Sequence, residues 1–136
     1  MSRTFFLLFF TVSLFAKNSF FDYTYSYVLQ KDQVAKIDIK KDYLPTKKQD
    51  GKLEFRWTLY KAGKLVLLVN YEGHPTQYLL EKRYKRNSVK ISLVGNYPTV
   101  SKEAFAIIRF DSFKNKKANL YVMIRDPQKR MEVRFK

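Results

Sequence analysis

The chain offers few side chains that could carry out catalysis. It contains one histidine, His74, and no cysteine. A structural zinc site needs four nitrogen or sulfur ligands and a catalytic one usually needs three protein ligands, so His and Cys can supply neither. A nucleophile–histidine–carboxylate arrangement would have to use His74, whose neighbours Gly73 and Pro75 indicate a turn. We therefore expect no catalytic residue, metal or cofactor. A hydrolase that uses His74, or a carboxylate pair such as Asp22 with Asp38, stays open as the alternative.

Positive charge is the second chemical feature of the chain. It has 27 Lys and Arg residues against 12 Asp and Glu, for a formal net charge of +15. Such a surface attracts polyanions: phosphate-bearing lipid, acidic polysaccharide or nucleic acid. A lysine-rich composition is also compatible with a merely solvated basic surface. The charge predicts the class of partner without identifying it.

The first sixteen residues are typical of a secretory signal peptide. Arg3 precedes a stretch from Phe5 to Phe15 in which nearly every side chain is apolar, and the small residue Ala16 follows. The stretch is about half of the ~20 residues that a membrane-spanning helix needs. We predict a signal peptide at 1–16 and one mature domain at 17–136, exported and periplasmic rather than fully secreted, with no transmembrane segment. Since an exported chain seldom meets nucleic acid, we expect no nucleic-acid partner.

Apolar residues after the leader recur mainly at every second position, which is the strand period. Ile37 and Ile39 alternate with charged residues, and so do Val133 and Phe135 at the other end of the chain. The aromatic face Phe21, Tyr23, Tyr25 and Tyr27 is expected to pack in the core. Turn signals separate about nine such segments: 21–27, 35–39, 53–60, 65–69, 78–84, 88–93, 104–110, 120–125 and 131–135.

Two antiparallel sheets packed face to face are the fold that this pattern favours, and a closed barrel is the alternative. Residues 65–69 are apolar on both faces, which predicts a central strand covered from two sides. Residues 41–52 are predicted to form the longest and most flexible loop, and 103–106 could be helical. The 23 aromatic residues must stabilise the core by packing, because no disulfide is available.

Strands that each run from end to end place successive connections at alternating ends of a sandwich. The connections at 30–32, 61–64, 85–87 and 111–117 would then share the more positive end. Several loop cations there could contact phosphate or carboxylate groups. The candidate anion- or partner-binding residues are Lys61, Lys64, Lys85, Arg86, Lys114, Lys116 and Lys117.

The run Phe55-Arg56-Trp57 on an early strand, the leader and the alternating strands resemble small exported bacterial proteins with an immunoglobulin-like β-sandwich. The resemblance implies a fold of seven to nine strands with Trp57 in the core. It differs from antibody-type domains in lacking the two cysteines that flank such a Trp, and it supplies no binding residues.

These observations predict a non-enzymatic, exported binding or envelope-associated module with a basic surface. Its expected partners are anionic envelope components or another exported protein, which an edge strand could also recruit by β-addition. The alternative is a small hydrolase acting on envelope polymers through His74. Inhibition of a wall-degrading enzyme is disfavoured where that enzyme is itself basic.

Overall fold

The protein folds into two antiparallel β-sheets. The computed structural model describes residues 20–44, 47–93 and 103–136, so the predicted signal peptide at 1–16 and the predicted turn at 95–98 lie outside the described residues. The elements are β1 Tyr23–Gln30, β2 Ala35–Leu44, β3 Lys47–Lys61, β4 Lys64–Tyr71, β5 His74–Glu81, the 3-10 helix η1 Arg83–Lys85, β6 Ser88–Ser92, β7 Phe105–Lys114, β8 Lys117–Arg125 and β9 Met131–Phe135. Among these residues, no helix is long and apolar enough to span a bilayer.

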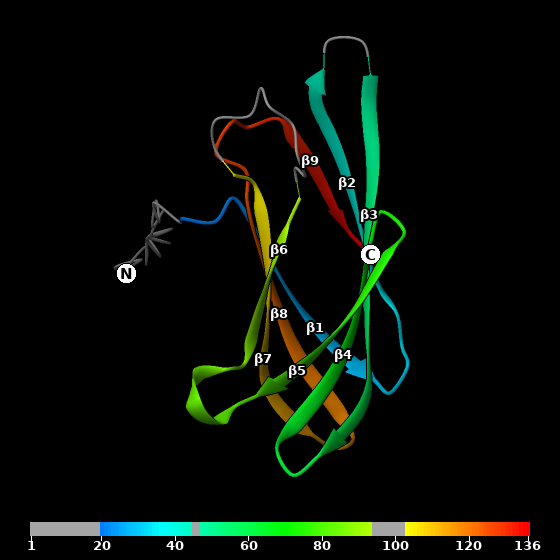
Figure 1. Ribbon diagram of the computed structural model, residues 1–136, viewed down its shortest axis with the longest axis vertical. Coiled ribbons are helices and arrows are strands. Elements are labelled where there is room, and N and C mark those ends of the chain that lie inside the picture. The colour runs from blue at the N-terminus through cyan, green and yellow to red at the C-terminus, as the bar shows by residue number, and fades with distance from the viewer. Residues whose placement is uncertain (1–19, 45–46, 94–102) are drawn as a thin grey trace, which may run out of the picture.

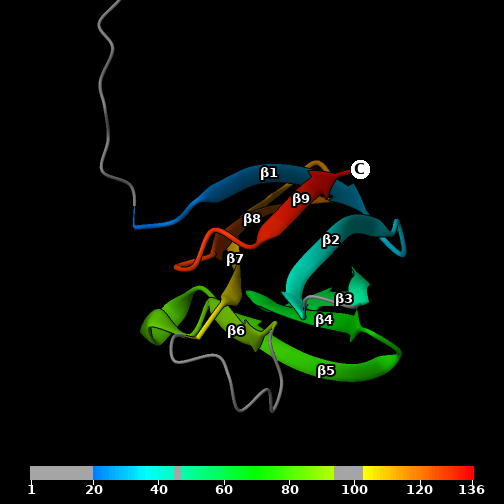
Figure 2. The ribbon, with the colours of Figure 1, turned by 90° about the horizontal axis from the view of Figure 1, so that it is seen from above.

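One sheet has four strands in the order β1-β8-β7-β6, and the other has five in the order β5-β4-β3-β2-β9. All ladders between the named strands are antiparallel. The two layers face each other, with β1 beside β9 on one side and β6 beside β5 on the other (Figures 1 and 2). The prediction of an all-β, two-sheet fold is therefore confirmed.

The core fills the space between the sheets with alternate side chains of each strand. Ile37, Ile39 and Leu53 of the five-stranded sheet are fully buried, as are Ile108 and Ile124 of the four-stranded sheet. Successive side chains of a strand point to opposite faces, so the alternation in the sequence becomes one buried and one exposed face. Burial of each large apolar side chain contributes roughly 1.5–3 kcal/mol before chain entropy is subtracted.

Hydrogen bonds from aromatic side chains also join the two sheets. The indole Nε1 of Trp57 in β3 donates to the carbonyl of Leu29 in β1 at 2.8 Å. At the opposite end, the hydroxyl of Tyr23 in β1 donates to the carbonyl of Met131 in β9 at 2.8 Å. The prediction that Trp57 lies in the core is confirmed, because its side chain is buried between the layers.

The aromatic face of the first strand is less buried than predicted. Tyr27 is buried, but Tyr25 is 47% exposed and Phe21 and Tyr23 are half-buried. β1 is an edge strand, and β9 of the other sheet covers its first residues only in part; the Tyr25 and Phe135 rings stack there at 5.0 Å. The strand also begins at Tyr23 instead of Phe21.

One prediction about the five-stranded sheet is wrong, and another holds only in part. The predicted loop at 41–52 is a hairpin, because β2 continues to Leu44 and β3 begins at Lys47. β4 lies between β3 and β5, as predicted for a central strand, but its outer face is covered only in part: Val66 and Leu68 are half-buried there, and no second layer of the described chain packs on them. Hydrophobicity alone does not indicate whether a third layer exists.

Three element boundaries also differ. The strand predicted at 78–84 ends at Glu81, and η1 follows it. The connection predicted at 111–117 is a two-residue turn, since β7 reaches Lys114 and β8 begins at Lys117. Residues 105 and 106, which could have been helical, are in β7.

Candidate functional site

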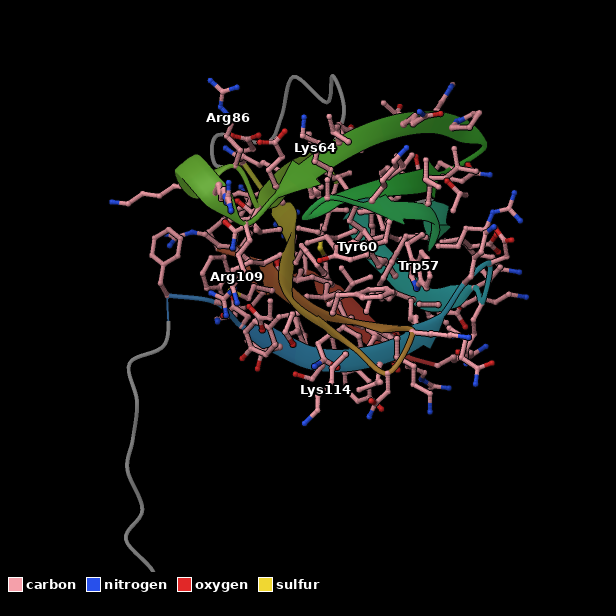
Figure 3. The ribbon with its side chains drawn as sticks, turned by 90° about the horizontal axis from the view of Figure 1, so that it is seen from below. Trp57, Tyr60, Lys64, Arg86, Arg109 and Lys114 are labelled. Carbon is pink, nitrogen blue, oxygen red and sulfur yellow. The ribbon has the colours of Figure 1, made fainter. Side chains whose placement is uncertain are left out.

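The four connections that were predicted to share one end of the sandwich do so in the structure. The β1–β2, β3–β4, β5–β6 and β7–β8 connections lie together at the lower end of the molecule in Figure 1. All seven candidate cations lie in or beside three of these connections and are exposed. Viewed onto this end, Lys64 and Arg86 lie on one side of Tyr60, and Lys114 lies on the other (Figure 3). The cations therefore surround the end of the sandwich instead of forming one cluster.

Two hairpins of similar sequence form opposite parts of this end. One reads Tyr60-Lys61-Ala62-Gly63-Lys64 and the other Phe113-Lys114-Asn115-Lys116-Lys117. Both two-residue turns have positive φ at each position, as type I′ hairpin turns require. Each turn thus brings two lysines into register opposite each other, Lys61 with Lys64 and Lys114 with Lys117.

Like charges directly opposite each other on adjacent strands are destabilising. Glu81 relieves one of the two pairs, because its carboxylate lies 3.3 Å from the Lys64 ammonium. Lys114 and Lys117 form no ion pair with a described residue. The β7–β8 turn therefore carries concentrated positive charge that no described acid neutralises.

A β-bulge in each hairpin turns an aromatic ring inward. In β3 the register shifts between Trp57 and Leu59, so Leu59 is 53% exposed while Tyr60 faces the other sheet. In β7 the register shifts between Phe110 and Ser112, which turns Phe113 toward the core as well. An extra residue in one strand reverses the facing of all residues after it.

The two inward rings form a stacked pair across the sheets. The Tyr60 and Phe113 ring centroids are 3.8 Å apart with an interplanar angle of 15°. Phe110 lies 6.0 Å from Tyr60, and Trp57 packs edge-on against Phe113 at 5.4 Å. These contacts connect the end of the sandwich to its core.

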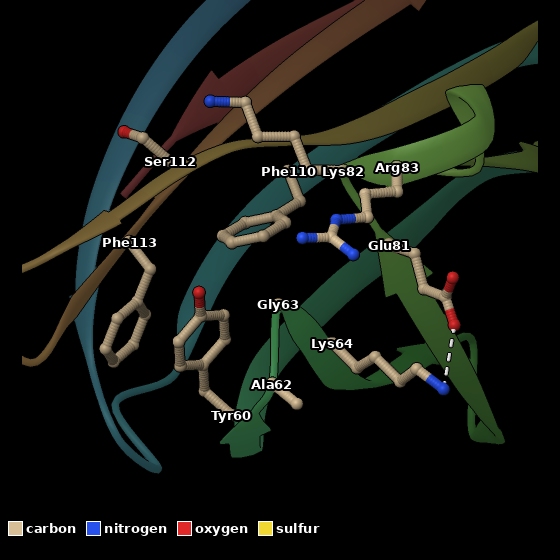
Figure 4. A pocket seen from close by; sticks show the side chains of 10 residues that line it. All are labelled: Tyr60, Ala62, Gly63, Lys64, Glu81, Lys82, Arg83, Phe110, Ser112 and Phe113. Carbon is tan, nitrogen blue, oxygen red and sulfur yellow. Dashed lines mark ion pairs between the residues drawn. The ribbon is translucent and has the colours of Figure 1, made fainter.

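Beside the stacked pair, a cavity of about 500 Å³ opens between the sheets. The three rings of Tyr60, Phe110 and Phe113 line one part of it, and the β3–β4 turn lines another. The remaining lining residues are polar or charged: Lys64, Glu81, Lys82, Arg83 and Ser112. In Figure 4 the Arg83 guanidinium extends toward the space beneath Phe110, and the Tyr60 hydroxyl points toward the same region.

Charge and hydrogen-bond donors are both present in this cavity. Lys82 and Arg83 form no ion pair with a described residue, whereas Lys64 is paired with Glu81. The Ser112 hydroxyl oxygen accepts a hydrogen bond from the Asn119 amide at 2.7 Å on the outer face of the four-stranded sheet, so it points away from the cavity (Figure 4). The cavity can therefore offer an anion two cations, Lys82 and Arg83, and the Tyr60 hydroxyl group.

Sequence reasoning identified one cation of the cavity, Lys64, and missed Lys82, Arg83 and the aromatic lining. The sequence predicted a strand at 78–84, which includes Lys82 and Arg83. In the predicted strand at 53–60, strict alternation directs Leu59 toward the core and Tyr60 away from it. A repeated pattern in the sequence could have indicated that the two hairpins are related: an aromatic residue, a lysine, two turn residues and a lysine. This pattern occurs at both hairpins and at no other described turn.

His74 lies at the opposite end, as the first residue of β5. Its side chain is exposed and makes no hydrogen bond or ion pair with a described residue. Asp22 accepts from the backbone N–H of Asp126 and pairs with Lys129, whereas Asp38 lies 2.5 Å from the Lys136 ammonium. In the described part of the chain, no group of three or more His, Cys, Asp or Glu residues could hold a metal ion.

Ionisable groups with displaced pKa values lie outside the cavity lining. Burial, with a smaller contribution from Tyr25, raises the pKa of Tyr27 to about 12. The pKa of Tyr23 is also raised, mainly by burial and then by the nearby Asp126. The hydrogen bond from Lys136 lowers the pKa of Asp38.

The fold and the site define an antiparallel two-sheet protein with an aromatic-lined, cationic cavity at one end. Comparisons with models of protein families, with curated proteins and with solved structures found no match to this chain. The residues and their geometry are therefore the basis for a function.

Proposed function

We propose that this protein is an exported, non-enzymatic binding module that holds an anionic component of the cell envelope at its basic end. The observation that carries the proposal is the pair of facing hairpins, each with two lysines in register. Opposed like charges cost stability, and a bound anion offsets that cost. The net charge of +15 brings anions to the surface from a distance.

Export is part of the proposal and rests on the sequence. The apolar stretch after Arg3 and the small residue Ala16 support cleavage before Lys17. The resemblance to exported proteins with an immunoglobulin-like sandwich supports a periplasmic location. Mass spectrometry of protein recovered from cells tests this part: an N-terminus at Lys17 supports export, and an intact Met1 on cytosolic protein contradicts it.

Two variants of equal net charge test the anion site. The first, R86Q/K114Q/K117Q, removes three cations of the basic end and avoids Lys85 and Lys116, which have positive φ. The second, K40Q/K52Q/R130Q, removes two exposed lysines and one exposed arginine elsewhere. Both variants lose the same charge, so only the position of the charge differs.

Retention on anionic lipid vesicles and on an acidic polysaccharide is measured at two salt concentrations. We expect the first variant to lose salt-sensitive retention and the second to keep most of it. Equal losses in the two variants would show that net charge alone determines binding, and the proposed site would then be wrong.

A further inference from the structure

The cavity beside the basic end has the dimensions and lining of a ligand site. Its volume of about 500 Å³ lies within the 300–1,000 Å³ typical of cavities that bind small molecules. Its floor is built on strands of both sheets, which hold the Tyr60, Phe110 and Phe113 rings by mutual packing. A site on such elements is largely formed before the ligand arrives.

The lining combines aromatic rings, the Tyr60 hydroxyl and two cations that form no ion pair with a described residue. Apolar ring surface accepts the C–H face of a sugar, and the Tyr60 hydroxyl can bond to its polar rim. Arg83 adds a planar donor that suits a carboxylate or phosphate. Glu81 is occupied by Lys64 at 3.3 Å, so it repels such an anion less than a free carboxylate would.

We infer that this cavity binds a single acidic sugar unit, a pyranose-sized ring that carries one carboxylate or phosphate. Arg83 pairs with the anionic substituent, Tyr60 bonds to a ring hydroxyl, and Phe110 and Phe113 contact the apolar face. The inference rests on the proposed function, because it specifies the anion that the basic end binds. The surrounding turn lysines then contact the rest of an acidic polymer outside the cavity.

Arg83 and Arg130 provide a matched pair of variants. Both are exposed arginines, but only Arg83 lines the cavity, whereas Arg130 lies between β8 and β9. Arg83→Gln removes the proposed anion partner, and Arg130→Gln makes the same chemical change outside both proposed sites. Tyr60→Phe keeps the ring stack and removes only the hydroxyl.

Four probes separate the parts of the ligand: glucuronic acid, glucose 6-phosphate, glucose and inorganic phosphate. Binding is followed by calorimetry and by the fluorescence of Trp57, whose ring contacts Phe113 at the cavity. We expect at least one of the acidic sugars to bind, at least tenfold more tightly than glucose or inorganic phosphate. The acidic sugar that binds identifies the substituent as carboxylate or phosphate.

Loss of a charged hydrogen bond weakens binding by about tenfold or more, so R83Q should lower affinity by that factor and R130Q by less than twofold. Y60F should lower it severalfold. Equal affinity in R83Q and wild type, inorganic phosphate binding as tightly as glucose 6-phosphate, or no binding of either acidic sugar would each overturn the inference.

The two proposals fail differently. If the acidic sugars do not bind while R86Q/K114Q/K117Q loses polyanion retention, the cavity inference is wrong and the proposed function stands. If that triple variant behaves like K40Q/K52Q/R130Q while R83Q releases the sugar, the basic-end surface is wrong and the cavity site stands.

Discussion

Replacement of Trp57 by Phe tests how the two sheets are held together. The Trp57 side chain is 4% exposed, and its Nε1 donates to the Leu29 carbonyl at 2.8 Å. Leu29 belongs to β1 of the opposite sheet, so this bond joins the layers. Phe keeps an aromatic ring at the position but cannot donate, and it is smaller than an indole.

The expected cost has two parts. Loss of the donor leaves a buried carbonyl without its partner, which costs about 1–3 kcal/mol. The smaller ring leaves unfilled volume beside Phe113, which adds about 1 kcal/mol. W57F should therefore lower the free energy of unfolding by about 2–4 kcal/mol. With a urea m value of ~1.5 kcal/mol/M, the unfolding midpoint falls by about 1–3 M.

Urea unfolding is followed by circular dichroism, because the variant lacks the tryptophan that would report by fluorescence. Phe55→Leu is the matched control: Phe55 lies two residues earlier in β3, is 1% exposed and donates no side-chain hydrogen bond. F55L removes apolar volume and the edge-on contact with the Tyr27 ring but no hydrogen bond, and it should cost about 1–2 kcal/mol. If W57F is no more destabilising than F55L, the hydrogen bond between the sheets contributes nothing and the reasoning is refuted.

Three further predictions concern charge. Lys117→Gln relieves the repulsion with Lys114 and should raise stability by about 0.2–1 kcal/mol at low salt while it weakens polyanion retention; a gain that persists unchanged in 1 M salt would argue against repulsion. Glu72→Gln leaves the buried Lys41 ammonium, 3% exposed, without its countercharge and should cost about 1–3 kcal/mol in urea unfolding, since Glu72 is itself partly solvated; a neutral result would show that Lys41 needs no pairing. The pKa of Tyr27 is 10.0 in the unfolded chain and about 12 in the folded protein. The contribution of Tyr27 to the free energy of unfolding is therefore fully present below pH 10 and is lost as the pH rises toward 12. Tyr27→Phe should flatten that fall in urea midpoints measured from pH 9 to 11.5, and an unchanged slope would contradict the assignment.

Alternation in the sequence was sufficient to predict most of the strands, although it left a closed barrel open as the alternative to two packed sheets. Ile37, Ile39, Leu53 and Ile108 belong to segments in which apolar residues recur at every second position, and all four are buried. Turn chemistry also predicted the β3–β4 hairpin, because Gly63 supplies a residue that adopts positive φ readily.

The site was harder to predict, because it depends on departures from alternation. A bulge after Trp57 turns Tyr60 inward, and a second bulge after Phe110 does the same for Phe113. Nothing in the local composition specifies these bulges. The stack forms only when both hairpins meet, which is a property of the tertiary structure. Arg83 was missed because the residues around it alternate as in a strand, whereas the structure places Arg83 in the 3-10 helix η1.

The aromatic donors that cross between the layers take the place that disulfides hold in many small exported domains. Phenol and indole groups do not respond to thiol reductants, and they need no oxidant or isomerase to form their bonds. The protein should therefore fold equally well in a reducing cytosol and in an oxidising compartment. It should also retain its fold under reducing conditions that would unfold a disulfide-stabilised domain of the same size.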